Sequence, residues 1–126
     1  MTQKEINRIM NKGKIKLDIF HSSIHVVFSR DEFNAIMRWR GHAEEFNSNG
    51  CAIHSCLEHA DTKETDDHFI IGIFNDDLST IVHEATHISL MFCDFIGHQI
   101  TKNDEIVPYL NGYIVKEIMK LKSKNA

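Results

Sequence analysis

The residues best placed to do chemistry lie in the run His83-Glu84-Ala85-Thr86-His87. Two histidines four residues apart project from the same face of an α-helix, because four residues turn the chain by about 400°. Both imidazoles can then reach one metal ion at about 2 Å, the usual Zn–N distance. Glu84 lies about 100° round the helix from His83, where it can reach an attacking water without being a ligand. The pattern predicts one zinc ion per chain, with Glu84 as the general base.

A competing interpretation needs no metal. On a buried helix, two histidines can be satisfied by carbonyls or carboxylates, with Glu84 in an ion pair, because buried polar groups need partners. The chain contains nine histidines among 126 residues. Histidine is the commonest metal ligand, so this composition favours the metal site.

Residues 79–113 resemble the zincin superfamily of metallopeptidases, and most of all its gluzincin branch. They also resemble small H-E-A-x-H proteins carried by bacteriophages and prophages, many of which have no assigned function. The resemblance implies a twisted sheet over the motif helix, a zinc cofactor, a peptide substrate and a following helix that brings the third ligand. Glu105, 18 residues after His87, matches the gluzincin position for that ligand.

Other third ligands stay open. His98 follows Gly97 just past the motif helix, a placement that some other zincins use, and Asp104 could substitute for Glu105. The metzincin pattern would need a glycine and a histidine where this chain has Leu90 and Cys93, so that branch is not favoured.

Three further residues are secondary candidates. Tyr109 and Gly112 share the helix face of Glu105. Tyr109 could donate a hydrogen bond to a ligand or an oxyanion, or simply pack in the core. Gly112 could let two helices approach closely, or be an ordinary weak point of the helix. Asp94, seven residues after His87, could orient a histidine or be a solvated surface residue.

The elements that must position these residues follow from periodicity. An apolar stripe formed by Ile81, Ala85, Ile88, Phe92 and Phe95, widened by Val82, Ser89 and Leu90, predicts that the motif lies on a core helix. Patterns elsewhere predict strands over residues 14–20, 24–28, 51–57 and 68–74, and helices over residues 33–40, 78–96 and 103–121.

This order indicates one α+β domain over residues 1–126, with a largely antiparallel sheet packed on the motif helix and the helix that follows. The first dozen residues are polar and are expected to fray or form a short helix, and the last four are expected to fray. Residues 51–57 and 68–74 are expected to form a hairpin, and either strand could hold an extended substrate by strand addition.

The bulk composition excludes several classes. The net charge of −4 and the absence of a basic stripe argue against a nucleic-acid partner. No apolar run approaches the roughly 20 residues that a membrane span needs. Cys51, Cys56 and Cys93 have no disulfide spacing, so free thiols and a cytoplasmic location are expected, in the host cytoplasm if a phage encodes the chain.

Among the remaining histidines, His54 is expected to be structural, and the others are expected to be exposed or at a sheet edge: His21, His25, His42, His59 and His68. His54 and Cys56 share one strand face, but Cys51 points to the other, so these three do not close a metal site.

Two functions remain. The first is a zinc metallopeptidase or related amide hydrolase. The second is an accessory binding protein on the same scaffold, attached to a host protein, with zinc structural or vestigial. A site closed by His83, His87, Glu105 and His98 would favour binding, and a water in the fourth place would favour hydrolysis.

Overall fold

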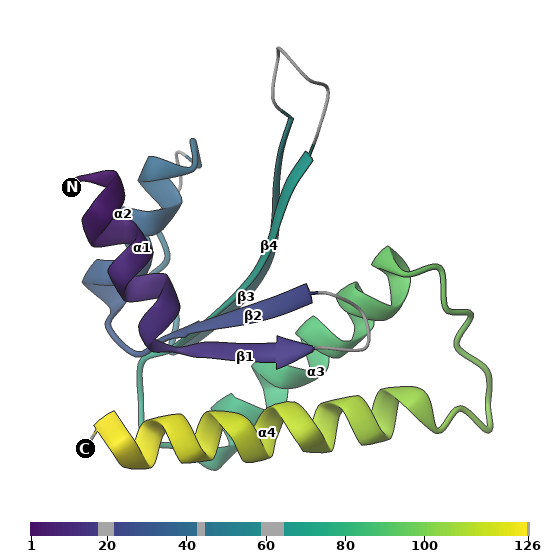
Figure 1. Ribbon diagram of the computed structural model, residues 1–126. Coiled ribbons are helices and arrows are strands. Elements are labelled where there is room, and N and C mark those ends of the chain that lie inside the picture. Colours follow the sequence, from purple (N-terminus) through teal and green to yellow (C-terminus); the bar gives the residue numbers. More distant parts are fainter. Residues whose placement is uncertain (18–21, 43–44, 59–64, 126) are drawn as a thin grey trace.

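The computed structural model describes residues 1–17, 22–42, 45–58 and 65–125 (Figure 1). The fold is α+β, as the sequence predicts. In chain order the described elements are α1 (Gln3–Lys12), β1 (Lys14–Leu17), β2 (Ser22–Val27), α2 (Arg30–Trp39), β3 (Gly50–Glu58), β4 (Thr65–Ile73), α3 (Leu78–Phe95) and α4 (Ile106–Asn125). The end of the first predicted strand, residues 18–20, lies outside the described residues.

The strands form one mixed sheet in the order β1-β2-β4-β3. Two antiparallel hairpins are present, β1 with β2 and β3 with β4, and the second is the hairpin that the sequence predicts. The sequence did not predict that β2 and β4 pair in parallel. This parallel pair arises because α2 and β3 intervene and return the chain to the start of the sheet, the kind of crossover that parallel neighbours require.

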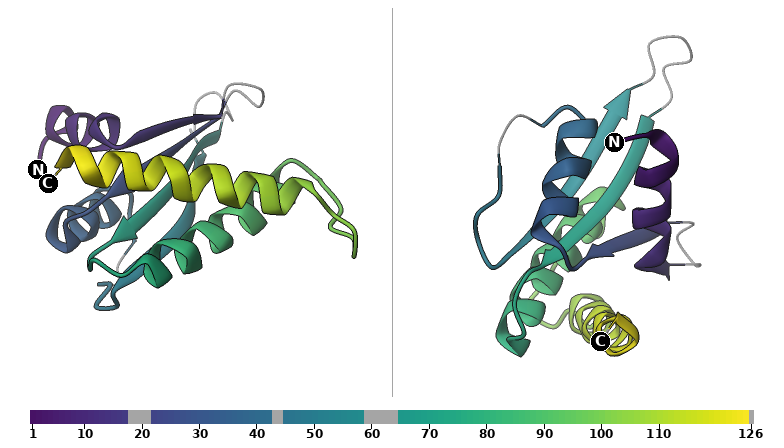
Figure 2. Two further views of the ribbon diagram at one scale, coloured as in Figure 1. Left: turned by 90° about the horizontal axis from the view of Figure 1, so that it is seen from below. Right: turned by 90° about the vertical axis from the view of Figure 1, so that its left-hand side faces the viewer.

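Helices cover both faces of the sheet (Figures 1 and 2). On one face, α3 and α4 contribute Ile81, Ile88 and Ile114 to a core completed by sheet residues such as Phe69 and Ile71. On the other face, a second core joins side chains of α1 and α2 to the opposite side of the strands. The central strands are therefore buried on both sides, and β4 carries the apolar run 69–73 that such a position needs.

The N-terminal segment is an ordered helix. Thr2 and Glu5 form a reciprocal capping box at the start of α1, and its buried residues are Ile6, Ile9 and Met10. At the other end of the chain, α4 continues to Asn125, beyond the predicted end at residue 121 and into the segment expected to fray. None of the described helices is long and apolar enough to cross a bilayer.

The motif helix α3 is less completely buried than its apolar stripe predicts. Ile81, Ala85, Ile88 and Phe92 are buried, but Phe95 is 46% exposed. Val82 and Leu90, which were expected to widen the stripe, are 41% and 42% exposed. The difference arises because, among the described elements, α3 packs chiefly on the sheet and on α4, so the side of the helix that faces away from both stays open.

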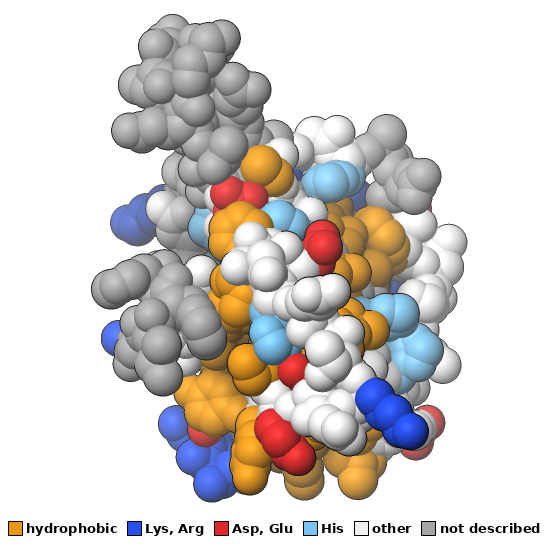
Figure 3. Space-filling view, turned by 90° about the vertical axis from the view of Figure 1, so that its right-hand side faces the viewer, with side chains coloured by type: hydrophobic (Ala, Val, Ile, Leu, Met, Phe, Trp, Pro, Cys, Tyr) orange, Lys and Arg blue, Asp and Glu red, His pale blue; other side chains and the backbone are white. Residues whose placement is uncertain are grey.

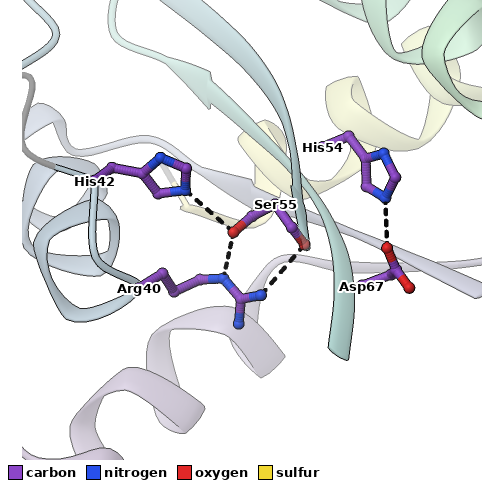
Figure 4. A network of polar contacts seen from close by, with 5 residues as sticks. All are labelled: Arg40, His42, His54, Ser55 and Asp67. Carbon is purple, nitrogen blue, oxygen red and sulfur yellow. Dashed lines mark hydrogen bonds and ion pairs between the residues drawn. The ribbon is translucent and has the colours of Figure 1, made fainter. Parts of the chain in front are cut away.

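Strand β3 forms an edge of the sheet. It pairs with β4 along its whole length and with no other described strand. On the face that carries α2, Arg40 holds the strand: its Nε donates to Ser55 Oγ at 2.6 Å and its Nη2 to the Ser55 carbonyl at 3.2 Å (Figure 4). Both residues are buried, so these bonds fix the edge strand against α2.

Candidate metal site

The two motif histidines lie side by side on the open side of α3. Their Nε2 atoms are 3.1 Å apart. Two nitrogens bound to one tetrahedral zinc at the usual Zn–N distance are about 3.3 Å apart, so the observed separation fits a shared ion. Both rings are exposed, and the His83 side chain is 67% exposed. In this structure the two Nε2 atoms face each other at hydrogen-bond distance, on a side of the helix that is open to solvent.

Glu84 points in a different direction from its neighbours. Its side chain is only 9% exposed, and Oε1 lies 3.8 Å from His83 Nε2. Burial raises the pKa of the Glu84 carboxyl above its usual range, and the charges of His83 and His87 partly offset that effect. A carboxyl group with a raised pKa, beside a pair of imidazole nitrogens, suits the work of a general base.

Gly50, the first residue of edge strand β3, gives Glu84 the space it occupies. A Cβ at position 50 would lie 2.9 Å from Glu84 Cγ and 2.8 Å from Thr80 Cγ2, closer than carbon atoms pack. A glycine is therefore needed for the strand to approach the helix. The neighbouring thiol reflects the same proximity, because burial and the charge of Glu84 raise the pKa of Cys51 to about 11. The sequence analysis did not single out Gly50, since nothing in its local pattern reports a close approach.

The two candidate third ligands that flank the α3–α4 connection lie in different surroundings. His98 Nε2 bonds Asp104 Oδ1, and Asp104 Oδ2 accepts from the Val107 N–H at 2.8 Å. The hydrogen bond from Val107, together with His98, lowers the pKa of Asp104. In this arrangement the nitrogen that His98 would offer to a metal is engaged. Glu105 is exposed at the start of α4.

Within the described residues, no group of three or more histidine, cysteine, aspartate or glutamate side chains is arranged to hold a metal ion. The structure thus brings His83 and His87 together, with Glu84 beside them, and leaves Glu105 and His98 apart from them. The cysteines Cys51, Cys56 and Cys93 form no disulfide bond in the described part of the chain.

The structure also shows the surroundings of the three secondary candidates, Tyr109, Gly112 and Asp94. Tyr109 is 73% exposed, so it is not a core residue. A Cβ at Gly112 would meet nothing within 4 Å, so the predicted close helix approach at this glycine is wrong. Asp94 is exposed, and the carboxylate that holds His98 is Asp104 instead.

The other described histidines have structural partners. His25 was expected to be exposed or at an edge, but it is 5% exposed: Nδ1 donates to the Met10 carbonyl at 2.9 Å and Nε2 lies 3.2 Å from His68 Nδ1. The expectation failed because strand β2 is covered by α1. His54 Nε2 lies 2.8 Å from Asp67 Oδ1 (Figure 4). His21 and His59 lie outside the described residues.

The surface around the connection between α3 and α4 mixes two kinds of side chain. Figure 3 looks onto this end of the molecule and shows exposed histidines next to hydrophobic side chains.

Comparisons with protein-family models, with curated proteins and with solved structures find no match to this chain. The site's own geometry must therefore carry the functional argument.

Proposed function

We propose that this chain is a zinc-dependent hydrolase of the zincin type, which cleaves peptide or related amide bonds. One observation carries the proposal: the Nε2 atoms of two exposed residues, His83 and His87, lie 3.1 Å apart, beside the buried side chain of Glu84. A helix that merely buried polar residues would have no reason to expose both imidazoles and bury the acid between them.

The donor set fits zinc. Two neutral imidazoles on one rigid helix are frequent ligands of this ion, and a carboxylate commonly completes the set. Glu105 remains our proposed third ligand, and it would have to approach the histidine pair from the exposed start of α4. When bound, zinc would polarise the substrate carbonyl and lower the pKa of a coordinated water to about 7.

Glu84 would move the proton. Its carboxylate would accept a proton from the attacking water and later return it to the leaving nitrogen of the amide. Its side chain is packed between α3 and Gly50 of the edge strand, which would hold the base in position before substrate binds. Little of its surface is open to solvent, which limits competition from bulk water.

Strand β3 would bind the substrate. Of the two strands proposed for strand addition, β4 is paired on both sides over residues 69–72, whereas β3 pairs with only one of the described strands. An extended peptide that paired with β3 would pass close to Glu84, because Gly50 touches that residue.

A second candidate function is a binding protein on the same scaffold. The observation that favours it is that the described residues bring only two metal donors together. Such a protein would use zinc as a structural part, or not at all, and would bind a partner protein through the same exposed surface.

Glu84→Gln separates the two functions. Glutamine keeps the size of the side chain but cannot accept the proton, so hydrolysis should fall at least about 100-fold, a typical loss for a general base. Zinc content should be unchanged, because Glu84 is not a ligand. The measurement is peptide cleavage, followed by mass spectrometry on a mixed peptide library, with zinc counted in the same samples. Equal cleavage by the variant would remove Glu84 from the mechanism.

A further inference from the structure

Phe95, the last residue of α3, is an exposed aromatic side chain that belongs to an ordered cluster. Its ring meets those of His54 and Phe69 edge-on, with centroids 5.2 and 5.5 Å away. The cluster is completed by Phe92, whose ring lies 5.4 Å from Phe69. Phe69 and Phe92 are buried, whereas Phe95 is 46% exposed. We call the four residues His54, Phe69, Phe92 and Phe95 the aromatic cluster.

The cluster reaches the edge strand through His54. The His54 ring stacks on Phe69 at 4.5 Å with an interplanar angle of 10°. Its Nε2 is also bonded to Asp67 of the neighbouring strand, as Figure 4 shows. The ring is thus fixed in plane and position, while 28% of the side chain stays exposed. Two fixed aromatic surfaces, one on β3 and one on α3, meet at the open edge of the sheet.

The distance from the cluster to Glu84 can be counted along two elements. Gly50 touches Glu84, and four residues further along β3, His54 touches Phe95. Four strand residues span about 14 Å. The eleven helix residues from Glu84 to Phe95 span about 16 Å. The two lengths agree, so β3 and α3 run alongside each other in the same direction from the proposed reacting centre to the aromatic cluster.

An extended peptide on the free edge of β3 would follow the same spacing. It advances by the same rise per residue, and every second side chain points to the same face of the sheet. A side chain four residues from the one opposite Gly50 would therefore lie beside His54, on the face that carries Phe95. A large exposed aromatic surface at that point favours an apolar or aromatic ligand.

We propose that the aromatic cluster is a substrate subsite, which binds a large apolar or aromatic side chain about four residues from the scissile bond of an extended polypeptide. This inference rests on the proposed hydrolase function, and it names the class of substrate. The occupant is the substrate chain itself, since the cluster continues directly from Glu84 along the only edge that β3 leaves unpaired among the described strands.

The test uses the zinc-loaded Glu84→Gln protein, which should bind peptides without cleaving them. The probes are fluorescein-labelled twelve-residue peptides of alanine, serine and threonine, in which a single phenylalanine is moved through every position. Affinity is measured by fluorescence polarisation.

Phe95→Ala is compared with Phe95→Leu, which keeps an apolar surface. The matched control is Leu90→Ala, since Leu90 is also an exposed apolar residue of α3, at 42%, but is not a member of the aromatic cluster. Melting temperatures of all variants verify that they are folded.

We expect one phenylalanine position to bind at least tenfold more tightly than the others. That preference should disappear in Phe95→Ala, survive in part in Phe95→Leu and be unchanged in Leu90→Ala. No peptide binding, no preferred position, or a preference that Phe95→Ala leaves intact would each overturn the subsite. Repeating the titration with a chelator separates the two claims. A Phe95-dependent preference in a protein that takes up no zinc would retain the subsite and reject the zinc hydrolase. Zinc uptake without any preferred phenylalanine position would reject the subsite and leave the hydrolase proposal standing.

Discussion

Within the motif, neighbouring residues have opposite environments. His83 and His87 are exposed, whereas Glu84 is buried against the edge strand. The sequence alone could place both histidines on one helix face, because that follows from a spacing of four. It could not give the burial of Glu84, which depends on a strand more than 30 positions earlier in the chain and on the missing side chain of Gly50.

His25, whose pKa is clearly shifted, lies outside the proposed metal site. Burial lowers the pKa of His25 to about 4, the hydrogen bond to the Met10 carbonyl opposes this effect, and the charges of His68, Lys14 and Arg40 add to the lowering. Between about pH 6.5 and pH 4, His25 binds a proton in the unfolded chain but stays neutral in the folded protein. Folding stability should therefore fall as the pH drops from about 6.5 to 4, by a total on the order of 3 kcal/mol.

Urea unfolding at pH 7, 5.5 and 4 measures this loss of stability. His25→Gln is the control, because glutamine can still donate to the Met10 carbonyl but does not titrate in this range. The free energy of unfolding of the variant should depend less on pH than that of the wild-type protein. Parallel pH profiles for the two proteins would show that His25 does not cause the loss.

At the scale of elements, the contact between β3 and α3 is the most constrained feature. Gly50→Ala would force a methyl group to within 3 Å of Glu84 and Thr80. We expect it to destabilise the fold by about 1–3 kcal/mol, the usual effect of overpacking, and to displace Glu84. Gly112→Ala is the matched control, since a Cβ there meets nothing within 4 Å. That change should stabilise α4 by up to about 1 kcal/mol. Thermal unfolding measures both, and equal effects of the two substitutions would contradict the close approach.

The connection between α3 and α4 carries both candidates for the third zinc ligand, His98 and Glu105. The left-handed Gly97, with φ 75°, ends α3, and the bond between His98 and Asp104 holds the loop that leads to Glu105. If Glu105 completes the site, Glu105→Ala should weaken zinc binding by at least about tenfold, in the range seen when ligand-supporting groups are lost. His98→Ala should change it far less. Competition with a chromophoric chelator gives both affinities, and the reverse ranking would make His98 the ligand.

For the whole molecule, local patterns predicted the elements better than their arrangement. The hairpin of β3 with β4 and the motif helix follow from periodicity over short windows. The parallel pairing of β2 with β4 does not, because it joins residues about 45 positions apart through an intervening helix and strand. The exposure of Phe95 was also missed, since an apolar stripe does not reveal where its covering sheet ends. The same open edge is what would leave β3 available to pair with a substrate.

The most direct test of the central claim is the zinc content of the purified protein, measured by elemental mass spectrometry after equilibration with limiting zinc. Wild-type protein should hold one zinc per chain, and His83→Ala should hold none. His42→Ala, which removes a histidine bonded to Ser55 on the opposite face of the sheet, should bind zinc as the wild type does. Since the His83 side chain is 67% exposed, its loss should leave the metal-free melting temperature unchanged. Absence of zinc from the wild type, or full retention by His83→Ala, would contradict the proposed metal site.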